Sequence, residues 1–212
     1  GPAATSGFDI VLTEVKAKGS HFFVAEAGSR GGEKMLSKVD SRKAAEKEIT
    51  LEQRVLERAR SQVGKSLDTS NLRSIFFEKF EHHRWNQTAK KCLACGNCTM
   101  VCPTCFCHSV EDSNSLSGDR TERWRRWDSC FTQDFSYMHG GTIRASVASR
   151  YRQWLGHKLA TWADQFGTIG CVGCGRCITW CPVGIDISQE ASAILQESMP
   201  PVKPRLRVAQ SA

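Results

Sequence analysis

Two cysteine runs constrain the fold of this chain more than any other feature of its sequence. Residues 91–103 read KCLACGNCTMVCP and residues 170–182 read GCVGCGRCITWCP, so the pattern repeats position for position. Each run spaces its cysteines by three, three and four residues and places a proline after the last one. Thiolates at this spacing are typical ligands of cubane iron–sulfur clusters. The sequence therefore predicts two [4Fe-4S] clusters.

The spacing also predicts which cysteines share a cluster. A C-x2-C-x2-C loop is short enough to hold three corners of one cubane, and Gly96 and Gly175 stand where a side chain would crowd it. In proteins with two such runs, the fourth cysteine of each run ligates the other cluster. We expect one set of Cys92, Cys95, Cys98 and Cys181, and a second set of Cys171, Cys174, Cys177 and Cys102.

Zinc is the alternative metal for clustered cysteines. Zinc ribbons use separated C-x2-C pairs, and two four-cysteine runs with trailing prolines fit that arrangement poorly. Three further cysteines, Cys105, Cys107 and Cys130, lie outside the two runs. They are either small buried residues, as free cysteines commonly are, or ligands of an additional cluster. A fourth ligand would then come from Asp128, His108 or a cysteine outside this chain.

Composition narrows the class of protein. Eleven cysteines in 212 residues, with no secretory leader, argue against a disulfide framework and for metal in a reducing compartment, the cytoplasm. The formal net charge is +7, and it falls to about +3 once two clusters of about −2 each are included. We therefore expect an ordinary solvated surface and no nucleic-acid partner. Because no run approaches 18 apolar residues, we also expect no membrane span.

The chain divides into three parts on its sequence. Residues 1–40 are expected to be the end of a small α+β region, with two strands within residues 8–24 and then a glycine-rich turn. Residues 41–197 are expected to form a mainly α-helical two-cluster [4Fe-4S] ferredoxin-like domain, because helical sequence separates the two runs. The insert between the runs, residues 104–170, is expected to be helical, and residues 198–212 are expected to be a flexible tail.

Local patterns predict the helices of this domain. An amphipathic helix is expected over residues 41–63, and another over about 70–85 leads into the first run. In the insert, residues 111–119 are a predicted loop. Residues 121–131, TERWRRWDSCF, are a predicted helix that places Trp124, Trp127 and Phe131 in the core. Residues 146–167 are a predicted second helix whose buried side carries Tyr151, Trp154, Leu155, Leu159 and Trp162.

Three stretches together carry a family resemblance. CLACGNCTMVCPTCFC, RWRRWDSCFTQDFSYMHGG and GCVGCGRCITWCPVGIDI resemble the iron–sulfur β subunit of cytoplasmic, NADP-reducing nickel–iron sulfhydrogenases. The A subunit of anaerobic sulfite reductase is similar. The resemblance covers most of residues 8–190, and the eight assigned cysteines match the family's cluster ligands one for one. It also implies that this chain is a C-terminal portion, because its first residues resemble sequence from the middle of family members.

The resemblance implies a function. We expect an electron-transfer subunit, without catalytic residues of its own, that relays single electrons through two [4Fe-4S] clusters. Its expected partners are a flavin/NAD(P)-binding diaphorase subunit and the small and large subunits of a nickel–iron hydrogenase. One alternative is the electron-transfer subunit of an anaerobic sulfite reductase. Another is a nucleic-acid-binding or sensory iron–sulfur protein, which would bind DNA in a salt-sensitive way.

Overall fold

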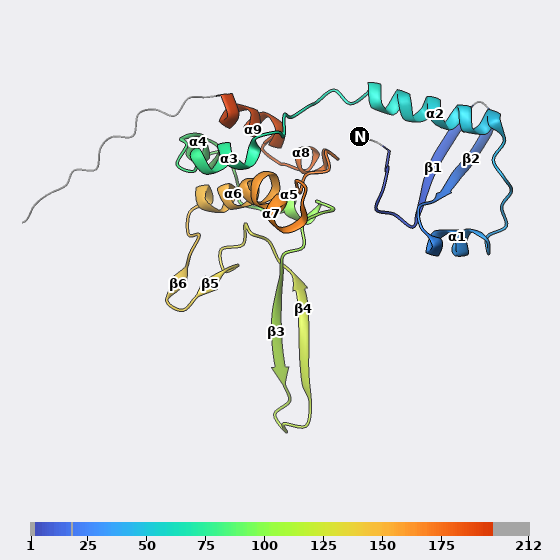
Figure 1. Ribbon diagram of the computed structural model, residues 1–212. Helices are drawn as coiled ribbons and strands as arrows, with labels where there is room; N and C mark the ends of the chain where they lie inside the picture. Colours follow the sequence, from blue (N-terminus) through green and yellow to red (C-terminus); the bar gives the residue numbers. More distant parts are fainter. Residues whose placement is uncertain (1–2, 18, 197–212) are drawn as a thin grey trace, which may run out of the picture. The chain divides into compact units, whose positions relative to one another are not determined.

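The computed structural model describes residues 3–17 and 19–196 of the chain. The chain forms two compact units, which divide between Ser66 and Leu67 (Figure 1). The helix expected over residues 41–63 therefore lies in the first unit, not with the cysteine runs, which both lie in the second. None of the helices in the described ranges has the length and apolar character needed to cross a membrane.

The first unit is a hairpin covered by a helix. Strands β1 (Ile10–Ala17) and β2 (Ser20–Ala27) pair antiparallel, with Val15 opposite Phe22. Val15 and Val24 are buried, and α2 (Glu46–Ser61) packs against both strands. The two predicted strands and the amphipathic helix are confirmed.

The glycine-rich segment of this unit differs from its prediction as a turn. It begins helix α1 (Arg30–Leu36), because the Ser29 hydroxyl accepts a hydrogen bond from Gly32 N at 3.1 Å. Gly32 also lies so close to the Asp9 carbonyl that a Cβ atom would meet the oxygen at 1.8 Å. The glycine therefore serves close packing of α1 against the start of β1.

The second unit is built from short helices around the two cysteine runs. They are α3 (Leu72–Glu78), α4 (Arg84–Ala89), α5 (Asn97–Met100), α6 (Val147–Gly156), the π-helical turn η1 (His157–Thr161), α7 (Trp162–Phe166), α8 (Arg176–Thr179) and α9 (Ile187–Gln196). The helix predicted over residues 70–85 is in fact two, α3 and α4. The long helix predicted over residues 146–167 is confirmed as α6, η1 and α7 in succession.

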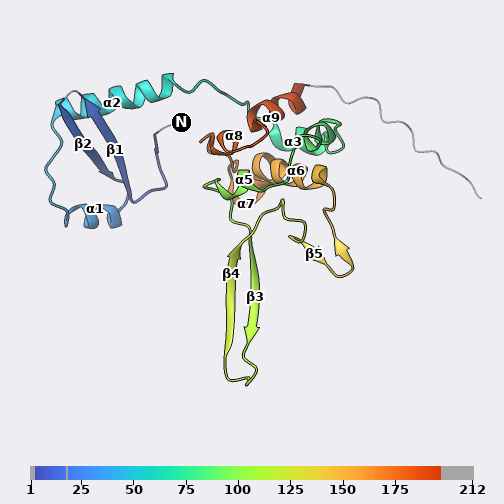
Figure 2. The same cartoon turned by 180° about the vertical axis from the view of Figure 1, so that it is seen from behind.

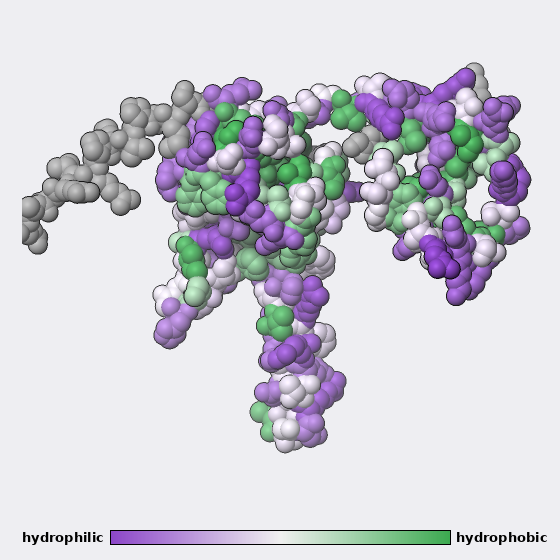
Figure 3. Space-filling model, viewed as in Figure 1, coloured by the Kyte–Doolittle hydropathy of each residue, from purple (hydrophilic) through white to green (hydrophobic). Residues whose placement is uncertain are grey.

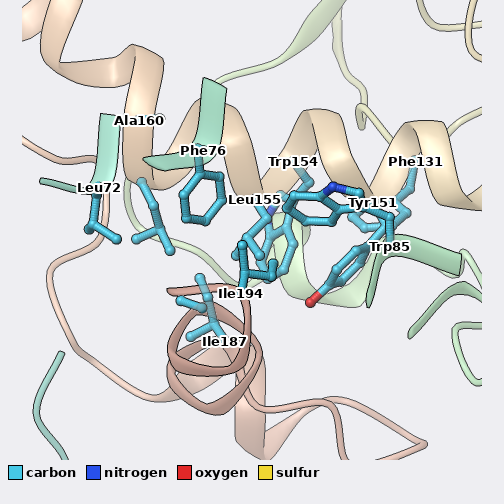
Figure 4. Packing of buried hydrophobic residues seen from close by; sticks show 12 residues of the cluster. Leu72, Phe76, Trp85, Phe131, Tyr151, Trp154, Leu155, Ala160, Ile187 and Ile194 are labelled. Carbon is cyan, nitrogen blue, oxygen red and sulfur yellow. The ribbon is translucent and has the colours of Figure 1, made fainter. Parts of the chain in front are cut away.

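Apolar side chains from five of these helical elements, α3, α4, α6, η1 and α9, meet in one core (Figure 4). Leu155 of α6 and Ile194 of α9 are fully buried there, beside Phe76 of α3 and Trp85 of α4. All five residues predicted for the buried side of the long helix are at most 8% exposed. Several cysteines of both runs pack against the edge of this core, so burying the core also positions the thiols.

The insert between the cysteine runs is only partly helical. Residues predicted as a helix form strand β4 (Thr121–Trp127), which pairs antiparallel with β3 (His108–Asn114). This hairpin extends away from the helices in both ribbon views and has a largely hydrophilic surface (Figures 1, 2 and 3). Trp124 and Trp127 are 51% and 69% exposed, so their predicted place in the core is wrong, whereas Phe131 is buried at 3%.

A second, shorter hairpin follows in the insert. Strands β5 (Tyr137–Met138) and β6 (Gly141–Thr142) pair before α6 begins. The mainly α-helical fold class is therefore confirmed only in part, because hairpins occupy much of residues 104–146. The tail expected over residues 198–212 lies outside the described residues.

Candidate metal centre

The two cysteine runs adopt the same backbone conformation. Ala94 and Gly173, which occupy equivalent positions, have φ angles of 51° and 69°. Gly96 and Gly175 follow with φ angles of 75° and 72°, and each is the residue before a one-turn helix, α5 or α8. This left-handed conformation favours glycine. The sequence repeat is therefore a structural repeat, and α5 and α8 lie in contact.

The first predicted ligand set surrounds one cavity. Its lining includes all four cysteines of the set: Cys92, Cys95, Cys98 and Cys181. Cys181 comes from the second run, so the structure brings the fourth cysteine across as the spacing predicts. Cys177, from the second set, also lines this cavity. Phe131, Tyr151 and Trp154 close its inner side.

The second predicted set is brought together in the same crossed way. The negative charges that raise the pKa of Cys177, after burial itself, are those of Cys171, Cys102 and Cys174. Cys102 belongs to the first run, and it is joined to the start of the second through Thr104. The Thr104 hydroxyl lies 3.3 Å from Cys102 Sγ and donates to the Gly170 carbonyl at 2.6 Å.

Burial and crowding of the thiols set their charge state. Burial raises the pKa of Cys177 to about 11, and it raises the pKa of Cys98 further, with Cys92, Cys177, Cys95 and Cys181 adding like charge. Cys102 is the opposite case. A hydrogen bond from the Cys105 thiol lowers the pKa of Cys102 to about 4, and Thr104 and the Lys158 charge lower it as well. Four crowded thiolates need a cationic core to hold them together, and an iron–sulfur cluster supplies one.

Two orphaned donors test whether a cluster fits the first cavity. The Tyr151 hydroxyl and Trp154 Nε1 are buried without a hydrogen-bond partner among the described residues, and both side chains line the cavity. An unpaired buried donor costs about 1–3 kcal/mol. A cluster in this cavity would bring sulfur acceptors next to two side chains that carry such donors, so the lining suits a sulfur-rich group.

A single zinc ion fits these cysteines less well. Among the described residues, no three His, Cys, Asp or Glu side chains converge on a point that could hold one metal ion. Zinc requires that convergence, because its thiolate ligands stand only about 2.3 Å from the metal. A cubane is a larger body that keeps its four ligands further apart.

The three remaining cysteines lie together. Cys105, Cys107 and Cys130 line a second, small cavity, which His157, Lys158 and Trp162 also line. A hydrogen bond from Cys130 lowers the pKa of Cys107 to about 6, and the same contact raises the pKa of Cys130. Neither Asp128 nor His108 is among the residues described as lining this cavity. The Asp128 carboxylate instead bonds Ser129 N at 2.7 Å and the Ser109 hydroxyl.

Sequence reasoning missed several residues that hold the first run in place. The Thr99 and Ser129 hydroxyls lie 2.7 Å apart, and the Ser129 hydroxyl accepts from Phe131 N at 3.1 Å. Gly96 packs on Ser129, where a Cβ would meet the hydroxyl at 3.3 Å. No spacing signal links residue 129 to residues 96 and 99. The buried Lys158 was missed for the same reason, since it lies among apolar residues of the long helix.

Comparisons with known proteins agree with this geometry. A family model described as a 4Fe-4S dicluster domain matches residues 91–185, and another with the same description matches residues 52–106. The sulfhydrogenase 2 subunit beta of Pyrococcus furiosus is 38% identical over 123 residues, which is 58% of this chain and 36% of that protein. This chain thus spans about a third of the length of that relative. No solved structure matches the chain.

These matches bear out two predictions from the sequence: the two [4Fe-4S] clusters and the resemblance to a sulfhydrogenase β subunit. The described dicluster domain calls for two [4Fe-4S] clusters, and it spans both cysteine runs and the insert between them. The chain therefore matches a 4Fe-4S dicluster domain over residues 91–185 and is a homologue of a sulfhydrogenase β subunit.

Proposed function

We propose that this chain relays single electrons, in a cytoplasmic complex, between a flavin/NAD(P)-binding subunit and a nickel–iron hydrogenase. The observation that carries the proposal is the crossed meeting of the two cysteine runs, in which α5 and α8 lie in contact. When bound, [4Fe-4S] clusters accept and pass on one electron at a time. Two of them held by adjoining runs would lie close together, as a relay needs.

The residues of the chain hold and shield the clusters. We propose Cys92, Cys95, Cys98 and Cys181 as one ligand set, and Cys171, Cys174, Cys177 and Cys102 as the other. Backbone amides near the sulfurs support this assignment: Ala94 N donates to Cys92 Sγ at 3.4 Å, and Ile185 N donates to Cys181 Sγ at 3.2 Å. Such hydrogen bonds stabilise thiolate charge and raise a cluster's potential. The aromatic core beside the first cavity excludes water from its inner side.

Replacing the two crossing cysteines one at a time tests the ligand sets. Cys102→Ser should damage the cluster held by the second run, and Cys181→Ser should damage the cluster held by the first. Each variant, purified without oxygen, should lose about four irons relative to the unaltered chain. The electron paramagnetic resonance (EPR) spectra of the two reduced variants should then differ from each other. Identical residual spectra would contradict the crossed assignment.

Co-purification with native partners tests the complex. The name of the Pyrococcus relative supports hydrogenase partners, so nickel and flavin should accompany the chain in anaerobic pulldowns. Siroheme in place of nickel would instead support the sulfite reductase alternative. In the assembled complex, Cys102→Ser should reduce hydrogen-dependent NAD(P) reduction at least tenfold. Hydrogen–deuterium exchange at the nickel–iron site should persist, because that reaction needs no relay.

Cys105, Cys107 and Cys130 remain proposed ligands of an additional cluster. Their convergence on one cavity supports this role, and the fourth ligand would then come from a residue not assigned here. Iron content tests it: an additional cluster adds about two to four irons to the eight of the two cubanes. A Cys107→Ser variant should lose that excess alone. Eight irons in both proteins would leave the three cysteines as buried thiols.

A further inference from the structure

Lys158 is a buried cation beside the second cysteine set. Its side chain is part of a residue only 3% exposed. Its ammonium donates to the Thr104 hydroxyl at 2.8 Å and to Cys102 Sγ at 3.5 Å. The same nitrogen lies 4.5 Å from the centre of the Trp162 ring. The ammonium therefore sits between an aromatic face and a proposed cluster ligand.

No carboxylate balances this charge within the described residues. Ion pairs there link other lysines and arginines to Asp or Glu, and none includes Lys158. A buried charge is costly unless an opposite charge or several hydrogen bonds compensate it. The acidic group in contact with the ammonium is the Cys102 thiol, whose Sγ lies 3.5 Å from Lys158 Nζ. The compensating charge is therefore carried on sulfur.

The backbone around Lys158 is also specialised. The residue lies in the π-helical turn His157–Thr161, a rare geometry often found at functional sites. The Lys158 carbonyl accepts a hydrogen bond from Gly170 N at 2.8 Å, immediately before Cys171. Thr104 contacts both Lys158 and Gly170, since its hydroxyl accepts a hydrogen bond from the Lys158 ammonium and donates one to the Gly170 carbonyl. One lysine thus joins the end of the first run to the start of the second.

The other buried cation near a cysteine run is placed differently. Arg150, on α6, is 7% exposed and donates to the carbonyls of Arg144 and Ala145 at 3.5 and 3.3 Å. Its charge lowers the pKa of Cys92 only as the last of several influences. Within the described residues, no hydrogen bond from a side-chain cation to a sulfur of the first set is seen. The two cluster sites therefore differ in their electrostatic surroundings although their loops repeat.

We propose that Lys158 is a positioning residue that sets the potential of the cluster held by Cys102 above that of its neighbour. This inference rests on the proposed ligand sets. Reduction adds one negative charge to a cluster, and a fixed ammonium at the ligand sulfur stabilises that charge. The cluster of the second run is then reduced first. A single electron that enters the relay therefore rests on that cluster.

An anaerobic redox titration followed by EPR tests the proposal on the full chain. The signal that Cys102→Ser alters identifies the second cluster. Lys158→Met should make reduction of that cluster at least tenfold less favourable, a fall of about 59 mV for one electron, and leave the other cluster unchanged. Lys158→Arg should restore most of the potential. Lys91→Met is the matched control, because exposed Lys91 precedes Cys92 and its charge is screened by solvent.

Each outcome decides one point. Unchanged potentials in a Lys158→Met protein with about eight irons would overturn the role of Lys158 and leave the ligand sets intact. Fewer than about eight irons in the unaltered chain would instead overturn the proposed function itself. If Lys158→Met fails to assemble, Lys158→Gln replaces it as the neutral variant. Selective loss of the second cluster in both neutral variants, with recovery in Lys158→Arg, would make Lys158 a structural support of the cluster and overturn the potential-setting role.

Discussion

At the scale of single residues, two glycines of the second unit differ in how closely other atoms pack against them. A Cβ atom on Gly170 would meet ring atoms of Trp162 at 2.5 and 2.6 Å, whereas one on Gly156 would meet nothing within 4 Å. Gly170 therefore lets the start of the second run pack flat against the ring that also faces Lys158. Gly156 has no such role and only weakens helix α6.

Paired substitutions test this difference. Gly170→Ala should destabilise the second unit by about 1–3 kcal/mol, because overpacking forces the ring or the loop to move. Gly156→Ala should stabilise it by up to about 1 kcal/mol, as expected inside a helix. Chemical denaturation of both anaerobic holoproteins measures the two effects. Equal changes in the free energy of unfolding would show that the contact of residue 170 with the Trp162 ring does not require glycine.

The Tyr151 hydroxyl gives a second test at this scale. Within the described residues it is buried without a hydrogen-bond partner, on a side chain that lines the first cavity, so Tyr151→Phe removes a donor that cluster sulfur could satisfy. The variant should leave the cluster-free protein as stable as before or slightly more stable. In the holoprotein it should lower the potential of the first cluster, which a redox titration measures. A less stable cluster-free variant with an unchanged potential would contradict this role.

The sequence predicted residues well where spacing carries the chemistry. The cysteine runs, the glycines inside them and the proposed crossing of the fourth cysteines all follow from ligand geometry, and the structure places cysteines of both runs around the first cavity. Lys158, Thr104 and Ser129 could not be found in this way. They act through contacts between segments distant in sequence, and such contacts leave no local pattern.

At the scale of elements, the hairpin of β3 and β4 shows why helical periodicity gave a wrong prediction for residues 121–131. Trp124, Trp127 and Phe131 fall at helical spacing, but only Phe131 is buried. Both faces of β3 and β4 are largely exposed, so no alternation of apolar and polar residues marks the strands. The long helix was predicted correctly because its apolar stripe faces a real core.

Shortening the hairpin tests its independence from the clusters. Glu111 pairs with Trp124, so residues 111–124 can be removed and an Asn-Gly turn placed between Val110 and Arg125. Iron content should stay unchanged, and the free energy of unfolding should change by less than about 0.5 kcal/mol, as for exposed sites. Loss of iron would show that the hairpin supports the cluster sites. The bond between Ser109 and Asp128 stays intact as the internal control.

At the scale of the whole molecule, the cluster chemistry belongs to one of the two units. All eleven cysteines lie between residues 92 and 181, within the unit that begins at Leu67. The sequence alone placed this boundary earlier, because the charged helix α2 lacks any signal that it packs on β1 and β2. A fragment of residues 67–212 should therefore bind the same iron as the full chain. Iron assays and EPR of the fragment check this, and loss of one cluster would assign a role to residues 1–66.

The central claim is that two crossed [4Fe-4S] clusters occupy the paired cysteine runs. Iron and acid-labile sulfide assays on the full chain, purified without oxygen, test it most directly when combined with EPR after dithionite reduction. We predict a brown protein with at least about eight irons and eight sulfides per chain and the spectrum of two interacting reduced cubanes. A colourless protein that contains zinc, or iron near four per chain with a single-cluster spectrum, would contradict the account.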